Sequence, residues 1–543
     1  MTTRRAFLGG AGVAALGGLD AALLPPGQAG ADATEANARS RAAFRLRRDA
    51  AHAYLGHPEP PQHSNGDEER YADRRASFSK TLPHNDLGEV KPEAYKEWLA
   101  ILAAGDPKGF ERVPRDPAAT VKLNNPQAAY AFDLVGVDPH ATRLAPPPAF
   151  ASARMACEMA EVYWLALTAD VPFREYESHR LIAAALADLN AFSAPLGPGP
   201  HRKLTPGTLF RGETPGDLAG PYVSQFLWLD VPYGMTTIQQ RYRSPGRGQG
   251  FLTDYKEWLA CQSGMGTGAR LRFDPEPRFI CSNRDLAGFV HRDFPYQAYL
   301  NAALIMLGFS EGALSPTNPY RGSRTQVGGM TFGGPNVLSL LGAASLIALK
   351  GSYYHKWLVH RRLRPESFAG RVETHLSGRK KYDIHADVLG CDAVGRVRSA
   401  HGTGLLPCAY PEGCPTHPSY PAAHAANAGA CATILKAFFH EEFVVPRPVQ
   451  AREDGSALEP WRGRDLTLGG EINKLANNIT LGRDAAGVHY RSDGVEGLSI
   501  GERQAIGILC DYSRAYNEHF DGFALTRFDG QKVKIANGTV TVA

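Results

Sequence analysis

Residues Pro421 to His440 read PAAHAANAGACATILKAFFH, a stretch dominated by alanine and other apolar side chains. Its apolar residues recur at intervals of three and four, the spacing that places them on one face of an α-helix. Pro421 is a natural first helical residue, because the N–H that proline lacks is unpaired in the first turn anyway. We therefore expect a helix here, with Ala422, Ala423 and His424 in its first turn.

Six further stretches share this helical spacing: Ser152 to Leu167, Tyr176 to Phe192, Asp285 to Leu307, Pro335 to Leu363, Glu471 to Gly482 and Glu496 to His519. Sustained alternation of apolar and polar residues, which is typical of half-buried strands, is rare. The exception is the tail FALTRFDGQKVKIANGTVTVA, whose turn signals Asp529-Gly530 and Asn537-Gly538 predict a small β-ribbon. The sequence thus predicts an all-α protein with a small C-terminal β-ribbon.

Three pieces of the chain carry basic residues that can converge on one tetrahedral oxyanion: KWLVHRRLRPE (Lys356 to Glu366), HPSYPAAHA (His417 to Ala425) and LGRDAAGVHYRSD (Leu481 to Asp493). Lys356, Arg364 and Arg483 supply fixed positive charge and donors. His424 and His489 offer ring nitrogens that can ligate, attack or shuttle protons. This set of groups suits phosphate, or its close mimic vanadate.

The spacings fit such a site if the pieces lie at helix ends. Lys356 and Arg364 are eight positions apart, roughly 80° around one helix, so that both can face one cleft, and Pro365 then stops that helix. The helix start after Pro421 offers free N–H groups to an anion. Arg483 and His489 lie roughly 120° apart on a straight helix, so we expect Gly487 to break it.

The three pieces resemble the signature of the vanadium haloperoxidases and the type 2 phosphatidic acid phosphatase superfamily. That signature is a Lys and an Arg-Pro, then Pro-Ser-Gly-His, then an Arg with a His six residues on. The LRPE, HPSYP and GVHYRSD segments and the eight-residue Lys-to-Arg interval resemble the algal bromoperoxidase branch in particular. Weaker similarity extends the resemblance over most of the mature chain: NGDEERY (Asn65 to Tyr71), HRDFPYQAYLNAALIML (His291 to Leu307) and NKLANNITLGR (Asn473 to Arg483).

The resemblance implies a fold of helical bundles and a role for each site residue. His489 would bind vanadium through a ring nitrogen, or act as nucleophile if the bound group is phosphoryl. His424 would be the acid–base group, and Lys356, Arg364 and Arg483 would neutralise the oxyanion. Lys356 would also polarise bound peroxide, the Ala423 N–H would donate to the oxyanion, and His417 would lie near the halide. Asp293 is a candidate for a carboxylate that orients an arginine or histidine, with a surface acid as the alternative.

One position departs from the family. This chain has Ala422-Ala423 where the signature has Ser-Gly before the histidine. Ala423 can still donate its backbone N–H, but Ala422 has no hydroxyl to bond an oxyanion oxygen. Losing one hydrogen bond to a charged group costs roughly 1.5–3 kcal/mol, or about ten- to a hundredfold in affinity. The site is weakened by this change rather than abolished.

The activity implied by the resemblance is that of a secreted vanadium-dependent haloperoxidase. It oxidises bromide or iodide with hydrogen peroxide to hypohalous acid. One alternative is an acid phosphatase that uses the same site with a histidine nucleophile; the other is a relative that has lost halide oxidation. Taken singly the residues also have ordinary explanations, such as a solvated basic face formed by Lys356 and Arg364 together with Arg361 and Arg362. Algal relatives assemble into dimers and larger oligomers, so we expect a homo-oligomer.

Composition and the N-terminal segment indicate whether the protein binds nucleic acid, is exported or spans a membrane. The net charge of +4 on 543 residues is small, and no basic run with interleaved aromatic residues suggests nucleic-acid binding. The start MTTRRAFLGGAGVAALGG pairs Arg4-Arg5 with a Gly/Ala-rich stretch, which predicts a twin-arginine signal peptide over residues 1–33 and a periplasmic or extracellular protein. An ordinary helical start is the alternative, favoured by Asp20. No other stretch has the ~20 uninterrupted apolar residues of a membrane span, so we expect no membrane in the mature form.

The mature chain is expected to divide in two. Residues 34–284 would form a helical scaffold and assembly surface, and residues 285–543 would carry the site. Eight cysteines lack the paired spacing of a zinc site. Cys408 and Cys414 flank a loop that a disulfide would close, but buried free thiols are the expected state of most of the eight.

Overall fold

The computed structural model describes residues 33–56, 59–198 and 203–543. The predicted signal segment therefore lies outside the described residues, apart from its last position. The chain divides into two compact units, residues 1–57 and 58–543. Within the first unit, α1 (Ala33–Leu55) is a helix of 23 residues whose Phe44 and Leu55 side chains are exposed.

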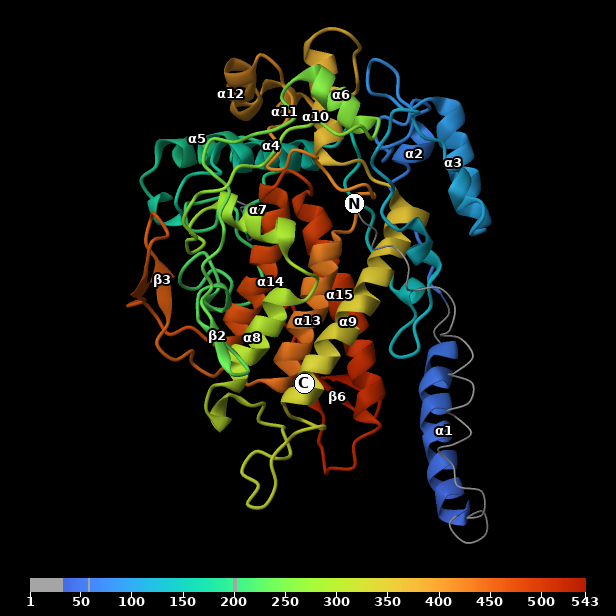
Figure 1. Ribbon diagram of the computed structural model, residues 1–543, viewed down its shortest axis with the longest axis vertical. Coiled ribbons are helices and arrows are strands. Elements are labelled where there is room, and N and C mark those ends of the chain that lie inside the picture. Colours follow the sequence, from blue (N-terminus) through green and yellow to red (C-terminus); the bar gives the residue numbers. More distant parts are fainter. Residues whose placement is uncertain (1–32, 57–58, 199–202) are drawn as a thin grey trace, which may run out of the picture. The chain divides into compact units, whose positions relative to one another are not determined.

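Four helices form the centre of the second unit (Figure 1). α13 (Ala423–Phe438) packs against α9 (Gly334–Tyr354), α14 (Leu468–Ala485) and α15 (Arg491–Ser513). Its small residues let the neighbours approach closely: a Cβ on Gly501 of α15 would overlap the carbonyl oxygen of Ala426. α7 (Asn283–Arg292) packs on α14, and α8 (Gln297–Leu307) packs on α9. The all-α prediction is confirmed.

Further helices cover the end of this bundle at which α13 and α15 begin (Figure 1). They are α4 (Ala153–Leu167), α5 (Arg180–Leu189), α10 (Pro365–Leu376), α11 (Ala386–Gly390) and α12 (Asp392–His401). The short or peripheral helices are α2 (Asp67–Arg70), α3 (Pro92–Ala104) and α6 (Tyr255–Gln262). α4 packs on α5, α11, α12 and α14, so it joins this cap to the central bundle.

Within the described residues the strands form three small antiparallel sheets. β5 (Phe523–Thr526), β6 (Lys532–Ala536) and β7 (Thr539–Val542) make the predicted C-terminal ribbon, with β6 in the middle. Two hairpins were not predicted: β1 (Val231–Tyr233) with β2 (Thr236–Ile238), and β3 (Val449–Ala451) with β4 (Leu458–Pro460). Strands of three residues are too short to give an alternating pattern.

Two of the predicted long helices are divided in the structure. The stretch from Asp285 to Leu307 forms α7 and α8, which are separated by Asp293 and the residues up to Tyr296. Pro295 lies in this gap, where it cannot continue a helix. The stretch from Pro335 to Leu363 forms α9 and a π-helical turn, His355–His360, which ends at Arg361 with φ 40°.

Both proline predictions at helix ends were wrong. Pro365 does not stop the helix of Lys356, which ends at His360; instead it is the first residue of α10, and Arg364 precedes it as the N-cap. Pro421 lies before α13, which begins at Ala423 with Ala422 as its N-cap. The cause is tertiary: the Ala422 N–H donates to the carbonyl oxygen of Asp493 at 2.8 Å, which holds this segment extended against α15.

Burial explains two further features. Residues Gly334–His360 are long and apolar enough for a membrane span, with mean hydropathy 1.3, but 56% of that window is buried inside the protein, as in a core helix. All eight cysteines are free and buried, as expected for most of them. Residues 58–543 pack as one compact unit, and the division of function after residue 284 stays a prediction.

Candidate active site

His489 lies in the turn between α14 and α15, held at both ring nitrogens. Gly487, with φ 76°, follows the end of α14 and supplies the predicted break. Nδ1 of His489 lies 2.9 Å from the carboxylate of Asp493, and Nε2 lies 2.9 Å from Nη1 of Arg364. A carboxylate only accepts and a guanidinium only donates, so the proton is on Nδ1 and Nε2 keeps its lone pair.

Arg364 lies on the Nε2 side of this histidine, and both Arg364 and Lys356 are fully buried. Arg364 donates to the Val488 and His417 carbonyl oxygens at 2.7 and 2.9 Å and to Nδ1 of His417 at 3.0 Å. Lys356 Nζ donates to the carbonyl oxygens of Pro418 and Ser419, both at 2.8 Å. The prediction that both residues lie on one helix is wrong, because the helix of Lys356 ends at His360. Both side chains nevertheless contact the same segment, from His417 to Ser419.

A cavity of about 770 Å³ opens in front of His489. The predicted site residues on its wall are His417, Ala423, His424, Arg483, His489 and the candidate carboxylate Asp293, whereas Lys356 and Arg364 do not line it. Exposed residues at its edge include Asn124, Asn125, Gln127 and Leu346. The segment expected to be scaffold therefore also lines this active-site cavity.

Arg483 reaches the cavity from the last turn of α14. Its Nη1 donates to the carbonyl oxygen of Val290 at 2.7 Å, and its guanidinium lies 5.8 Å from the ring centre of Tyr410. Its Nε is buried and makes no hydrogen bond to any residue that the structure describes. A buried donor without a partner is costly, so this atom is suited to a bound acceptor.

His424 is the second residue of α13, next to Ala423. Its Nε2 lies 3.1 Å from the carboxylate of Asp293, whose side chain is only 3% exposed. The structure thus favours a histidine-orienting carboxylate over a surface acid at Asp293. Because the carboxylate accepts, Nε2 of His424 carries the proton and Nδ1 has the lone pair. The Ala422 side chain makes no capping hydrogen bond to the start of α13.

The electrostatics of the site are strongly positive. Among the residues described, Lys356, Arg364 and Arg483 form no ion pair with a carboxylate within 4.0 Å. Burial and the charge of Arg364 hold the pKa of His489 well below its usual value, and burial and Lys356 do the same for His417. Burial and Arg364 also lower the pKa of Lys356. An anion in the cavity would relieve this repulsion.

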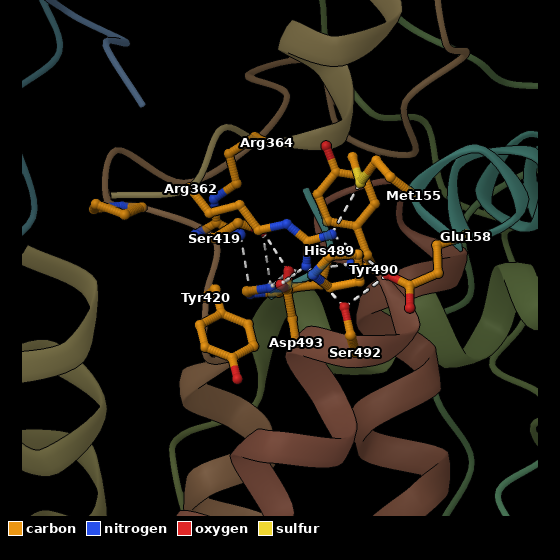
Figure 2. A network of polar contacts seen from close by, with 12 residues as sticks. Met155, Glu158, Arg362, Arg364, Ser419, Tyr420, His489, Tyr490, Ser492 and Asp493 are labelled. Carbon is orange, nitrogen blue, oxygen red and sulfur yellow. Dashed lines mark hydrogen bonds and ion pairs between the residues drawn. The ribbon is translucent and has the colours of Figure 1, made fainter. Parts of the chain in front are cut away.

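A buried polar network behind His489 was missed from the sequence (Figure 2). Asp493 accepts from Nη1 of Arg362 at 2.6 Å and from the hydroxyl of Ser419. Arg362 also lies 3.4 Å from the carboxylate of Glu158 on α4. Asp493 stands three residues after the N-cap Tyr490, the spacing of a capping box. A role as a helix cap explains this carboxylate from sequence alone, so its contact with His489 is not apparent. Arg362 was interpreted only as part of a solvated basic face.

Comparisons with known proteins place this geometry in a family. The chain is 33% identical over 600 aligned positions to the vanadium-dependent bromoperoxidase of Corallina pilulifera, covering 93% of this chain and 100% of the relative. It is 34% identical over 537 positions to the vanadium-dependent bromoperoxidase of Ascophyllum nodosum, covering 94% and 95%. This chain belongs to the vanadium-dependent haloperoxidases.

A solved structure and a family model agree with this membership. The homohexameric structure of the second vanadate-dependent bromoperoxidase from Ascophyllum nodosum matches with a TM-score of 0.88 and 28% identity, over 93% of this chain and 91% of that one. The model of the VCPO second helical-bundle domain matches residues 390–517. That range contains the start of α13 and the His489 turn, and so includes most of the haloperoxidase site.

Proposed function

We propose that this haloperoxidase holds vanadate at His489 and uses hydrogen peroxide to oxidise bromide and iodide to hypohalous acid. The observation that carries the proposal is the tautomer of His489 and the positive charge around it. Its Nε2 has an unprotonated lone pair that accepts from Arg364, beside three cationic side chains without a carboxylate partner among the described residues. Neutral imidazole nitrogen is a good transition-metal ligand. The relatives named above are vanadium-dependent bromoperoxidases.

The residues present fit a bound oxyanion. Arg483 Nε is a buried donor without a partner among the described residues, and the first N–H groups of α13 have no intrahelical acceptor. In the described parts of the chain, no group of three or more His, Cys, Asp or Glu side chains is placed to hold a metal cation. The proposed holders of vanadate are therefore His489 Nε2 as the ligand, Lys356, Arg364 and Arg483 as counter-charges, and the Ala423 N–H as a donor.

The protein's own groups handle protons and charge. Vanadate, when bound, supplies a Lewis acid that makes peroxide reactive toward halide. Nδ1 of His424 takes a proton from hydrogen peroxide, while Asp293 fixes the ring and stabilises the imidazolium that forms. Arg364 holds His417 through Nδ1, so that its proton is on Nε2, where it can donate to an anion such as bromide.

The test is to add orthovanadate to purified protein and measure peroxide-dependent bromination of a 1,3-diketone. We expect bromination only after vanadate is added, with iodide oxidised at least as readily as bromide. Hydrolysis of p-nitrophenyl phosphate that vanadate inhibits, without bromination, would instead show the phosphatase alternative. Absence of both activities in vanadate-loaded protein would support the relative that has lost halide oxidation.

We also propose that the protein is an exported homo-oligomer. The relative of known structure is a homohexamer, and it aligns with 93% of this chain. Export rests on Arg4-Arg5 and the Gly/Ala-rich stretch that follows. Expression with and without residues 1–33, followed by cell fractionation and light scattering, tests both. Full-length protein retained in the cytoplasm would contradict export, and a monomer at micromolar concentration would contradict assembly.

A further inference from the structure

We propose that Arg362 and Glu158 are positioning residues that hold Asp493 against Nδ1 of His489 and so, together with Arg364 at Nε2, select the tautomer of this histidine. This inference rests on the proposed function only in taking His489 as the oxyanion ligand. Four buried side chains form a row of polar contacts, each bonded to the next, that begins at the wall of the active-site cavity: His489, Asp493, Arg362 and Glu158 (Figure 2). The last of them belongs to α4, a helix that contributes no residue to the cavity wall.

The two carboxylate oxygens of Asp493 have separate partners. Oδ1 accepts from Nη1 of Arg362 at 2.6 Å. Oδ2 accepts from Nδ1 of His489 at 2.9 Å, from the Tyr490 N–H at 3.2 Å and from the Ser419 hydroxyl. Every one of these hydrogen bonds is strengthened by the charge of the carboxylate. Arg362 is the one of these partners that is itself a fixed cation, so we infer that it contributes most to holding the carboxylate in this orientation.

Arg362 is itself fixed from α4. Its Nη2 donates to the carboxylate of Glu158 at 3.4 Å and to Sδ of Met155 at 3.0 Å. Ser492 accepts from its Nη1 at 2.9 Å and donates to Glu158 at 2.7 Å, which closes a ring of contacts. The guanidinium also lies 4.2 Å from the ring centre of Tyr490. These contacts leave the guanidinium little freedom to turn away from Asp493.

The row of charges also explains why the site stays positive. Asp493 alone would cancel part of the charge of the cavity, because it lies against His489. Arg362 neutralises Asp493, and Arg154, 3.0 Å from Glu158, balances the second carboxylate. Together with Arg154 the row is neutral, so it cancels little of the charge that Lys356, Arg364 and Arg483 direct at an oxyanion.

The decisive variant is Asp493→Asn, which keeps the shape of the side chain and replaces one carboxylate oxygen by an NH₂ group. If Arg362 sets the orientation, the amide oxygen faces Arg362 and the amide nitrogen donates to Nδ1 of His489. The histidine proton then moves to Nε2, the hydrogen bond from Nη1 of Arg364 to Nε2 is broken, and the ligand lone pair is lost. If the Tyr490 N–H sets the orientation, the amide oxygen stays at His489 and the tautomer is unchanged. ¹⁵N NMR of histidine-labelled protein distinguishes the two, with His489→Gln to assign the signal.

We expect Asp493→Asn to shift the proton to Nε2 and to weaken orthovanadate binding by about 10- to 100-fold in equilibrium dialysis, as for other groups that orient a ligand. Adding Arg362→Met should free the amide to turn, return the proton to Nδ1 and recover part of the affinity. An unchanged tautomer in Asp493→Asn, or no recovery in the double variant, would overturn the role of Arg362.

Glu158→Gln provides a second arm in case the Asp493 variants do not fold. It should weaken orthovanadate binding by about tenfold. The matched control is Glu161→Gln on the same helix, since Glu161 is equally buried but pairs with Arg491, 2.5 Å away, rather than with Arg362. Equal vanadate affinity in the two variants would overturn the role of Glu158. Neither readout requires turnover, so a protein that binds vanadate without oxidising bromide still tests the inference.

Discussion

Replacing Ala422 by serine should strengthen vanadate binding and stabilise the start of α13. Ala422 is the N-cap of this helix, is 1% exposed, and makes no side-chain hydrogen bond to it. A serine hydroxyl has one proton to donate and two lone pairs to accept with. It can therefore accept from a first-turn N–H and donate to an oxyanion oxygen at the same time.

The magnitudes follow from these two hydrogen bonds. A serine N-cap stabilises a protein by about 1 kcal/mol relative to alanine, and one hydrogen bond to a charged group is worth roughly 1.5–3 kcal/mol, or about ten- to a hundredfold in vanadate affinity. Turnover at saturating vanadate should change little, because the hydroxyl would hold the oxyanion throughout the reaction.

Equilibrium dialysis gives the affinity, urea unfolding of vanadate-free protein gives the stability, and bromination at saturating vanadate gives the turnover. Unchanged affinity together with lower stability would refute the reasoning, because it would mean that the hydroxyl is buried without a partner. In that case the space beside Ala422 does not lead to the oxyanion.

Three further outcomes are expected. His424→Ala should keep vanadate but slow bromination by about 100-fold or more; equal rates from pH 5 to 8 would remove His424 from the mechanism. Arg483→Lys should weaken vanadate binding by about tenfold, since the Nε donor is lost while the charge is kept; equal affinity in dialysis would contradict this. Burial lowers the pKa of His355 to about 4 and of His84 to about 3. The unfolded chain therefore binds more protons below pH 6.5, and stability should fall from there toward pH 4 by about 1.4 kcal/mol per pH unit and histidine; equal urea midpoints at pH 7 and 5 would contradict this.

Local signals in the sequence predicted the parts of the fold that depend on local structure. The helical spacing of α4 and α13, the break at Gly487 and the turns of the β5–β7 ribbon were all found. The start of α13 was misplaced by two residues, because the hydrogen bond from Ala422 to Asp493 crosses between distant segments. The left-handed backbone at Arg361, which ends the helix of Lys356, has no such signal either, since glycine usually takes that conformation.

The same holds for the active site: residues with a characteristic spacing could be found from the sequence, and residues that act through distant partners could not. His489, His424 and Arg483 could be identified because their intervals match a known signature, and the structure brings them to one cavity. Arg362 could not, because its partners Asp493 and Glu158 lie 131 and 204 positions away along the chain. A buried arginine and a solvated one look alike in sequence until the helix that covers them is known.

The most direct test of the account is vanadate retention by His489→Ala. The substitution removes the proposed ligand nitrogen, while the cations of Lys356, Arg364 and Arg483 remain. Wild-type protein loaded with orthovanadate should retain about one vanadium per chain after dialysis, and the variant, with an unchanged circular dichroism spectrum, should retain almost none. Equal retention by a folded variant would show that the cations alone hold the oxyanion, and the assignment of His489 as the ligand would be wrong.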